Sequence, residues 1–443
     1  MKIKFDRIFL LKLLIVILTI NYMVITIIFN DMTILKYLRD IILIAMLGIC
    51  MAGSGFKVKR RSLFYLLIAV CGMVALLRAD SMSLGVACFR RYIFPVGVFI
   101  AVTKMKSISK EQNYKNFLKF VMVFFAIISV WGVFQAWVLG DEFLMNLGYP
   151  TAYLNQYKRV MLKHSFYFGG LGIQRVVSTI SNSNICGLIL GGSMLFLISG
   201  YKAIPFSGKM KITLLAAIAL GYLLTFSRSN FLALLFVVLF VAFKYIPYKK
   251  QIFLTGIALV VVALLSLVIQ GSDGIIYKLL EWVKDSLNLT DTSVAGRSGI
   301  WTEALQVIKD NPLGLGFGHV GSIAIDAKAS YYLSCENSYL AMAIDFGIIG
   351  ALIYVSFMIW IIYYLGRKAG KSKANGNAVA YRISRGGQSV IIYLMIVMFF
   401  SNHIYDMEAV AIIYAYAGIA ISVGGQNENN SILFTTISSD TGK

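Results

Sequence analysis

The chain has 443 residues, of which 59% are hydrophobic and 14% charged, and its mean hydropathy is +0.78. Soluble domains carry about 25% charged residues, so this composition excludes an ordinary soluble protein and predicts a polytopic, all-α membrane protein. The net charge of +21 does not by itself indicate nucleic-acid binding, because basic residues also set the orientation of membrane spans.

The apolar residues fall into blocks long enough for transmembrane helices, which need about 20 residues, or fewer where neighbouring helices shield them. The first block runs to Phe29 without a small-residue cleavage site, so we expect a retained span and not a signal peptide. The pattern predicts about twelve spans. They lie near residues 8–29, 34–52, 62–78, 84–103, 117–139, 183–199, 211–226, 229–246, 251–269, 338–365, 388–402 and 409–424.

The basic residues favour one orientation of these spans. If the N-terminus is cytoplasmic, every cytoplasmic loop is rich in lysine or arginine, and the largest cluster lies at 367–385. The opposite loops are mixed or acidic, with Asp141, Glu142 and Asp273 among their residues. The positive-inside rule therefore predicts that both termini are cytoplasmic.

This orientation places two long segments on the outer side of the membrane. The predicted organisation is spans one to five in 1–139, an outer loop in 140–182, spans six to nine in 183–269, a large outer loop between spans nine and ten in 270–337, spans ten to twelve in 338–424, and a tail in 425–443. The tail is polar, and we expect it to be disordered on the cytoplasmic side.

The second outer loop contains an amphipathic stretch. From Ile300 to Asp310 the apolar side chains recur at helical spacing, and Pro312 ends the helix because the residue before a proline avoids the α region. We expect this helix to lie on the outer membrane surface or on the bundle of spans. The residues Gly314, Gly316 and Gly318 then predict a flexible loop. They follow a proline and not a strand, which argues against a nucleotide-binding loop.

Arginine is concentrated at the predicted outer ends of the spans. Its planar guanidinium binds phosphate oxygens through two parallel hydrogen bonds and stays charged in a dry site. The set therefore predicts an anion site suited to a diphosphate. The alternatives are arginines that extend to the interface, or pairs such as Arg39 with Asp40 and Arg78 with Asp80. The set comprises Arg39, Arg78, Arg90, Arg91, Arg175, Arg228 and Arg297.

Glu336 lies at the mouth of span ten, at the end of the second outer loop. A carboxylate in this place could accept the proton of a sugar hydroxyl. Its alternative role is a negative charge that stabilises the N-terminus of a helix.

Metal ligation is not indicated. The three histidines, His164, His319 and His403, are isolated in the sequence, and the five cysteines show no metal-ligand spacing. We expect no cofactor.

Several short motifs occur in a fixed order within about 175–350. They are Ser178–Asn184, Ser227-Arg228-Ser229, Arg297-x-x-x-Trp301, Asn311-Pro312-Leu313-Gly314-x-Gly316-Phe317-Gly318, Asn337-Ser338-Tyr339-Leu340 and Gly347-x-x-Gly350. In order and spacing they resemble the O-antigen ligase and polysaccharide polymerase (Wzy/WaaL) superfamily, and most of all a Wzy-type capsular or O-antigen polymerase.

The resemblance implies a glycosyltransferase of the GT-C type that inverts the anomeric centre without a metal. Such an enzyme polymerises oligosaccharide repeat units linked to undecaprenyl diphosphate, at the outer face of the bacterial cytoplasmic membrane, into capsular or other surface polysaccharide. Its partners would be lipid-linked saccharides, membrane lipids, a flippase and chain-length regulator proteins.

The resemblance also implies roles for single residues. Arg175, Arg228 and Arg297 would bind the diphosphate, with Arg90 or Arg91 beneath them. Glu336 would be the base, and Asn337, Tyr339 and His319 are further candidates for substrate binding. The ligases of this superfamily carry a histidine immediately before the Asn-Ser-Tyr-Leu motif, where this chain has Glu336. This departure favours a polymerase over a ligase.

Three other classes remain open at this stage. One is ligase-type transfer of a glycan to a different acceptor. Another is a flippase or transporter, which would show internal repeats that are not visible here. The third is a structural or sensor membrane protein of the lipid II polymerase type. Glycan elongation in a reconstituted system would separate an enzyme from a transporter.

Overall fold

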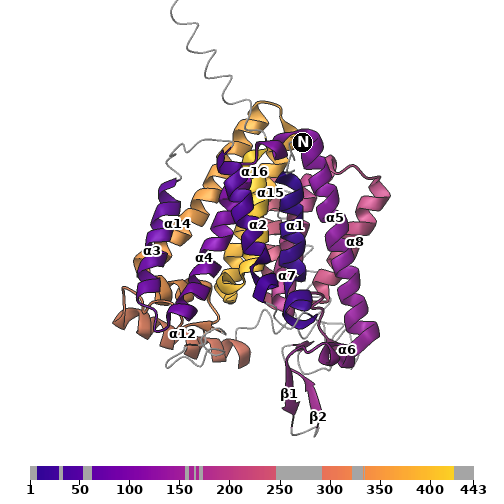
Figure 1. The fold of residues 1–443 in the computed structure, drawn as a ribbon. Helices are drawn as coiled ribbons and strands as arrows, with labels where there is room; N and C mark the ends of the chain where they lie inside the picture. The colour runs from indigo at the N-terminus through magenta and orange to yellow at the C-terminus, as the bar shows by residue number, and fades with distance from the viewer. Residues whose placement is uncertain are drawn as a thin grey trace, which may run out of the picture.

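The computed structural model of this chain is a bundle of helices with two small β-hairpins at one end (Figure 1). In the described residues, six helical segments are long and apolar enough to cross a membrane, and three further apolar helices are shorter. This agrees with an all-α polytopic membrane protein. The described residues are 7–28, 33–52, 62–154, 159–163, 166–168, 173–245, 292–321, 333 and 335–423.

The long helices follow the apolar blocks of the sequence. The first half contains α1 (Arg7–Ile20, continued by a π-helical segment Asn21–Ile28), α2 (Thr33–Ala52), α3 (Ser62–Leu77), α4 (Met82–Thr103), α5 (Glu111–Phe134, continued by Gln135–Leu139) and the short α6 (Gly140–Asn146). The second half contains α7 (Ser183–Gly200), α8 (Gly208–Leu223), α9 (Arg228–Tyr245), α12 (Thr292–Asp310), α14 (Ser338–Ala374), α15 (Ala378–Phe400) and α16 (Met407–Ser422).

A helix coincides with every predicted span except the one near 251–269, which lies outside the described residues, as does the tail. The largest boundary difference concerns α15, which begins at Ala378 although the span was predicted from 388. Its first turns carry Arg382 and Arg385, whose long side chains can reach the polar interface from within a helix. A prediction based on unbroken apolar runs therefore places the start of this helix too late in the sequence.

The two ends of the bundle can be told apart from contacts between helices. The amide of Asn21, just after α1, donates to Glu408 in the first turn of α16 at 3.4 Å, and Thr179 Oγ1 donates to Thr19 O at 2.9 Å. At the other end, the Lys368 ammonium donates to Ala420 O at 3.0 Å near the last turn of α16. Figure 1 shows α6, α12 and the β1–β2 hairpin together at the first of these ends, which we call the α12 end.

The segment 140–182 contains structure that the sequence did not reveal. Strands β1 (Thr151–Leu154) and β2 (Arg159–Leu162) pair antiparallel, as do β3 (Tyr167–Phe168) and β4 (Ile173–Gln174). The hairpins belong to a small separate core that is shared with α6. That core includes Leu144, Tyr149, Leu162, Phe166 and Val177.

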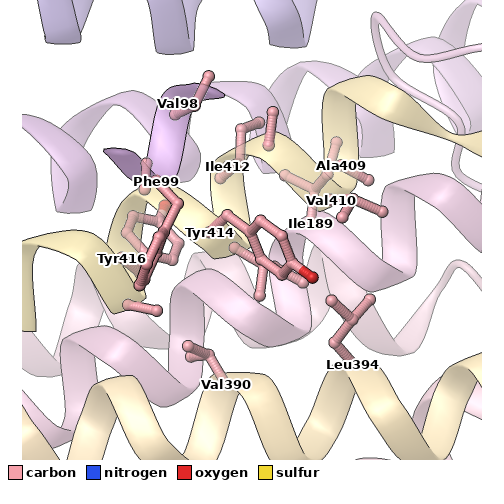
Figure 2. Packing of buried hydrophobic residues seen from close by; sticks show 14 of the residues in the cluster. Val98, Phe99, Ile189, Val390, Leu394, Ala409, Val410, Ile412, Tyr414 and Tyr416 are labelled. Carbon is pink, nitrogen blue, oxygen red and sulfur yellow. The ribbon is translucent and has the colours of Figure 1, made fainter. Parts of the chain in front are cut away.

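The core of the bundle is built around α16, whose residues from Ala409 to Ile421 are all buried (Figure 2). A helix that is apolar on all faces belongs in the interior of a bundle, and α16 packs against α4, α7 and α15. Its tyrosine hydroxyl at Tyr416 lies 2.9 Å from Ser193 Oγ, so this buried polar group is hydrogen-bonded. Large apolar side chains such as Leu66 on α3 are instead exposed, as expected of a surface that faces lipid.

The glycine-rich loop after α12 is packed into a break in α14. Gly347 interrupts α14 with a φ of 76°, and Gly314 has a φ of 78°. A Cβ on Gly314 would collide with the backbone nitrogen of Gly347, so these glycines permit close approach of two backbones. Leu315 N donates to Ile344 O at 2.7 Å, and Phe317 is fully buried. The expectation of a flexible loop was wrong, because the loop is a packed joint between α12 and α14.

Candidate functional site

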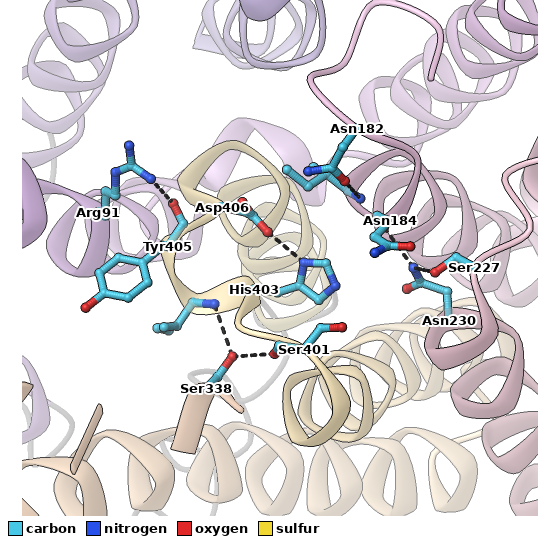
Figure 3. Close-up of polar contacts among 12 residues, drawn as sticks. Arg91, Asn182, Asn184, Ser227, Asn230, Ser338, Ser401, His403, Tyr405 and Asp406 are labelled. Atoms are coloured by element: carbon cyan, nitrogen blue, oxygen red, sulfur yellow. Dashed lines mark hydrogen bonds and ion pairs between the residues drawn. The ribbon is translucent and has the colours of Figure 1, made fainter. Parts of the chain in front are cut away.

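Polar and charged side chains gather at the α12 end of the bundle (Figure 3). They come from the first or last turns of helices that are far apart in the sequence, and from the short loops that join those helices. Four groups can be distinguished by the partners of their side chains.

The first group contains arginines in ion pairs. Arg39 on α2 pairs with Glu408 on α16, and Arg90 on α4 lies 3.4 Å from Asp40 on α2. The predicted pair of Arg39 with Asp40 was wrong, because consecutive residues of a helix point in different directions. Arg91 donates to Tyr405 O at 2.9 Å. Arg90 and Arg91, both predicted to lie beneath a diphosphate, therefore join α4 to α2 and to the α15–α16 loop.

The loop arginine Arg78 also lacks its predicted partner. Its guanidinium donates to Leu313 O at 2.8 Å, while Asp80 lies 3.1 Å from the Nε2 of His319. The other ring nitrogen of His319 lies 3.2 Å from Gly316 O, and the ring is buried. Both nitrogens of this candidate substrate-binding residue thus have protein partners.

The second group contains Arg175 and Arg228. Arg175 Nε donates to Thr225 O and its Nη2 donates to Asn184 Oδ1, both at 2.8 Å. These acceptors are neutral, so the hydrogen bonds hold the guanidinium without cancelling its charge. Burial, and then the nearby positive charge of Arg228, lower the pKa of Arg175 to about 10. Two guanidinium groups that repel each other form a place where an anion is stabilised.

The backbone around this arginine pair is strained. Ser178 and Phe226 have φ values of 56° and 46°, in the left-handed region that residues other than glycine rarely adopt. The strain is held by long-range hydrogen bonds, from Ser178 Oγ to Ile128 O at 2.7 Å and from Val176 N to Leu224 O at 2.9 Å. Such strain often accompanies a functional site, and here it lies on both segments that supply the pair.

The third group connects two of the sequence motifs. Asn230, in the first turn of α9, donates at 2.8 Å both to Asn184 O and to Ser227 Oγ (Figure 3). It also accepts from Tyr393 OH at 2.8 Å. The motifs Ser178–Asn184 and Ser227-Arg228-Ser229 are therefore adjacent in space, although about 45 residues of chain separate them. Asn182 contributes separately, as the cap of α7.

The fourth group surrounds the start of α14. Asn337 caps this helix, because its Oδ1 accepts from Tyr339 N at 2.9 Å, and its Nδ2 donates to Phe399 O at 3.0 Å. Tyr339 OH donates to Met395 O at 2.6 Å. These two predicted substrate-binding residues thus use their polar atoms to join α14 to α15. Glu336, immediately before them, is exposed.

The side chain of Arg297 lies outside the described residues, although its backbone belongs to α12. One turn further along α12, the Trp301 ring packs edge-on against Phe399 with centroids 5.5 Å apart. The amphipathic helix therefore lies against the end of α15.

Sequence reasoning missed one pair, His403 with Asp406, in the loop between α15 and α16. His403 Nδ1 lies 2.6 Å from Asp406 Oδ2, and the residue is 3% exposed. Its Nε2 has no hydrogen-bond partner in the described part of the chain. Ser338 holds this loop, donating to Ser401 O at 2.9 Å and accepting from Ile404 N at 3.2 Å. The spacing of three residues between His403 and Asp406 was the available signal, but it is too common to decide anything.

Comparison with known proteins points to the same superfamily as the sequence motifs. A family model described as O-Antigen ligase matches residues 212–355, from α8 into α14. An O-antigen polymerase from Salmonella muenchen is 24% identical over 282 residues, which cover 61% of this chain and 65% of that relative. Both comparisons support the resemblance of this chain to the O-antigen ligase and polysaccharide polymerase (Wzy/WaaL) superfamily.

Proposed function

We propose that this protein polymerises oligosaccharide repeat units linked to undecaprenyl diphosphate by glycosyl transfer, at the outer face of the bacterial cytoplasmic membrane. The observation that carries the proposal is the pair of Arg175 and Arg228. Arg175 is held by neutral oxygen atoms within the region matched by the superfamily motifs. The product would be a capsular or other surface polysaccharide.

In this proposal the two guanidinium groups bind the diphosphate of the donor, together with Arg297. When the bond between the anomeric carbon and the diphosphate oxygen breaks, its electron pair leaves with the diphosphate. Fixed guanidinium groups stabilise this developing charge more than the ground state, which is the condition for catalysis. Attack by a hydroxyl from the opposite face inverts the anomeric centre, and no metal is required.

The incoming hydroxyl must lose its proton to a base near the start of α14. Glu336 is the candidate that the sequence indicates, and its exposed position allows contact with a sugar. His403 is a second candidate, because Asp406 orients its ring and the Nε2 is unpartnered in the described residues. Ser338 directly connects the two places.

The orientation of the chain is part of the proposal. The α12 end would face the outside, since the basic cluster at 367–385 lies toward the opposite end of α14 and α15. Both termini would be cytoplasmic, and a flippase would deliver the lipid-linked units to the outer leaflet. Chain-length regulators are expected partners.

The test is polymer formation by the purified full chain in liposomes that contain lipid-linked repeat units. Arg175→Ala and Arg228→Ala should each lower the rate by about 10²–10³-fold, as removal of one donor to a developing anion does. Arg367→Ala is the matched control, because this arginine lies at the other end of the bundle beside Tyr363. Normal polymer growth in both site variants would refute the proposal.

Ligase-type transfer is the second candidate, favoured by the family model that matches residues 212–355. The same assay separates the two activities. A polymerase lengthens the lipid-linked glycan itself, whereas a ligase transfers it once to a different acceptor and leaves no ladder of lengths. A flippase would move the substrate without forming any bond.

A further inference from the structure

Asp345 is a buried carboxyl group that the proposed mechanism does not use. It lies in α14, about two helical turns after Ser338, and is 1% exposed. Its Oδ2 accepts hydrogen bonds from Tyr92 OH on α4, at 2.7 Å, and from Tyr405 OH in the α15–α16 loop. Its Oδ1 has no hydrogen-bond partner among the described residues. Burial of such a group costs free energy, which indicates that it does more than fill space between apolar helices.

The bond to Tyr405 reaches the loop that carries the second candidate base. Tyr405 is the last residue of the 3₁₀ turn His403–Tyr405. Its hydroxyl donates to Asp345, and its carbonyl oxygen accepts from Arg91 at 2.9 Å. Figure 3 shows His403 and Tyr405 on opposite sides of this turn. Since a single residue separates them in a short turn, a shift of Tyr405 also moves His403.

Two residues on one face of α14 hold this loop. Ser338 donates to Ser401 O and accepts from Ile404 N, and Asp345 accepts from the hydroxyl of Tyr405. Residues seven positions apart lie on the same face of a helix. The helix α14 therefore fixes where the loop lies relative to its own first turn.

The ring of His403 has the form that a general base requires. A carboxylate can only accept hydrogen bonds, so the Nδ1 that lies 2.6 Å from Asp406 Oδ2 carries a proton. In a neutral ring the Nε2 then has the free electron pair. Whether that nitrogen can take a proton from a hydroxyl depends on where the loop holds the ring.

We propose that Asp345 is a positioning residue for the proton transfer, because through Tyr405 it holds His403 where its Nε2 accepts the proton of the attacking hydroxyl. Asp345 itself does not touch the substrate. The catalytic part of this inference rests on the proposed function, whereas the connection from Asp345 to the histidine ring does not. Tyr92 binds the same carboxyl oxygen, but its hydroxyl comes from α4 and not from the loop.

The connection can be measured without turnover by nuclear magnetic resonance. The purified full chain is labelled with [¹⁵N]histidine in detergent, and the sequence has only three histidines, so single His→Gln variants assign every ring signal. The Nδ1–H signal of His403 reports its hydrogen bond to Asp406. The signals of His164 and His319 should stay unchanged in each variant, which shows that the fold is intact.

Tyr405→Phe and Asp345→Leu should both shift or broaden the Nδ1–H signal of His403. In the liposome assay both should lower kcat about 10²-fold, as a displacement of about 1 Å at a reacting centre does, and leave KM unchanged. Asp345→Asn should recover most of this loss, because one amide oxygen can accept both hydroxyl bonds.

Tyr92→Phe is the matched control. It removes a hydroxyl bond from the same oxygen of Asp345 and keeps the ring, whose centroid lies 5.7 Å from that of Tyr405. It should leave the His403 signal and kcat like those of the unchanged protein.

Three results would overturn the inference. They are an unchanged His403 signal in Tyr405→Phe, an equal effect of Tyr92→Phe on signal and kcat, and a shifted signal without any change in kcat. The proposed function is decided separately. If the unchanged protein forms no polymer, the polymerase is refuted, while a shifted signal in Tyr405→Phe would still retain the connection from Asp345 to His403.

Discussion

Asn230→Ala should weaken both the fold and the site, because Asn230 connects three helices at the arginine pair. The side chain is fully buried and takes part in hydrogen bonds with Asn184 O, Ser227 Oγ and Tyr393 OH, each at 2.8 Å. A side-chain hydrogen bond between membrane helices contributes on average about 0.6 kcal/mol and at most about 1.7 kcal/mol. Three such bonds give an expected loss of about 2 kcal/mol for the variant.

The assay is equilibrium unfolding of the purified chain in detergent, together with the rate of polymer formation. Tyr393→Phe removes the bond to Asn230 and also the 3.2 Å bond to Gly187 O, and should cost about 1 kcal/mol. The double variant should be less destabilised than the sum of the two single variants, since the shared bond is lost only once. Gln112→Ala is the control. Gln112 makes an exposed bond to Asn116 at 3.2 Å and should change stability by less than about 0.5 kcal/mol.

Activity should fall further than stability in Asn230→Ala, because Ser227 and Asn184 directly flank the arginine pair. A displacement of about 1 Å at a reacting centre can lower a rate by about 10²-fold. A variant that is as stable and as active as Gln112→Ala would show that Asn230 does not hold the site, and the assignment of the two motifs to one place would lose its physical basis.

Three further predictions follow from other contacts. His403→Gln and Glu336→Gln should differ in polymer formation, with the larger loss, about 10²-fold or more, in the variant that lacks the base; two unchanged rates would exclude both. Lys368→Met should lower stability by about 1–3 kcal/mol in a denaturation series, because Lys368 donates to backbone carbonyls of α16 at its last turn. Gly314→Ala should prevent correct packing of the glycine loop, visible as loss of monodisperse protein in size-exclusion chromatography, since Gly347 leaves no room for a Cβ.

The fold could be predicted from the sequence to the extent that burial in a membrane leaves a continuous apolar signal. The spans therefore coincide with helices wherever the chain is described. The hairpins were missed because strands as short as Tyr167–Phe168 carry no measurable alternation. The start of α15 was misplaced because Arg382 and Arg385 in its first turns break the apolar run, although long arginine side chains are compatible with a helix that enters a membrane.

The site was less predictable, because partners come from distant parts of the chain. The residue types alone could indicate an anion site, but they could not show that Arg39 pairs with Glu408 or that Asn337 is a helix cap. The motifs Ser178–Asn184 and Ser227-Arg228-Ser229 are connected by hydrogen bonds of Asn230, which is buried. No local sequence pattern distinguishes this asparagine from others. His403 was overlooked for the same reason, since its carboxylate partner matters only once the loop is folded.

The arginines at this end of the bundle fall into two groups according to their partners. Arg39 and Arg90 lie beside carboxylates that neutralise them, and such pairs hold helices together without leaving charge for a ligand. Arg175, next to Arg228, is hydrogen-bonded to carbonyl and amide oxygens, which are neutral acceptors. An anion site needs donors that are rigid and still positive, and neutral acceptors supply both conditions. The paired arginines are therefore expected to govern stability, and the arginines near Asn184 to govern the binding of anions.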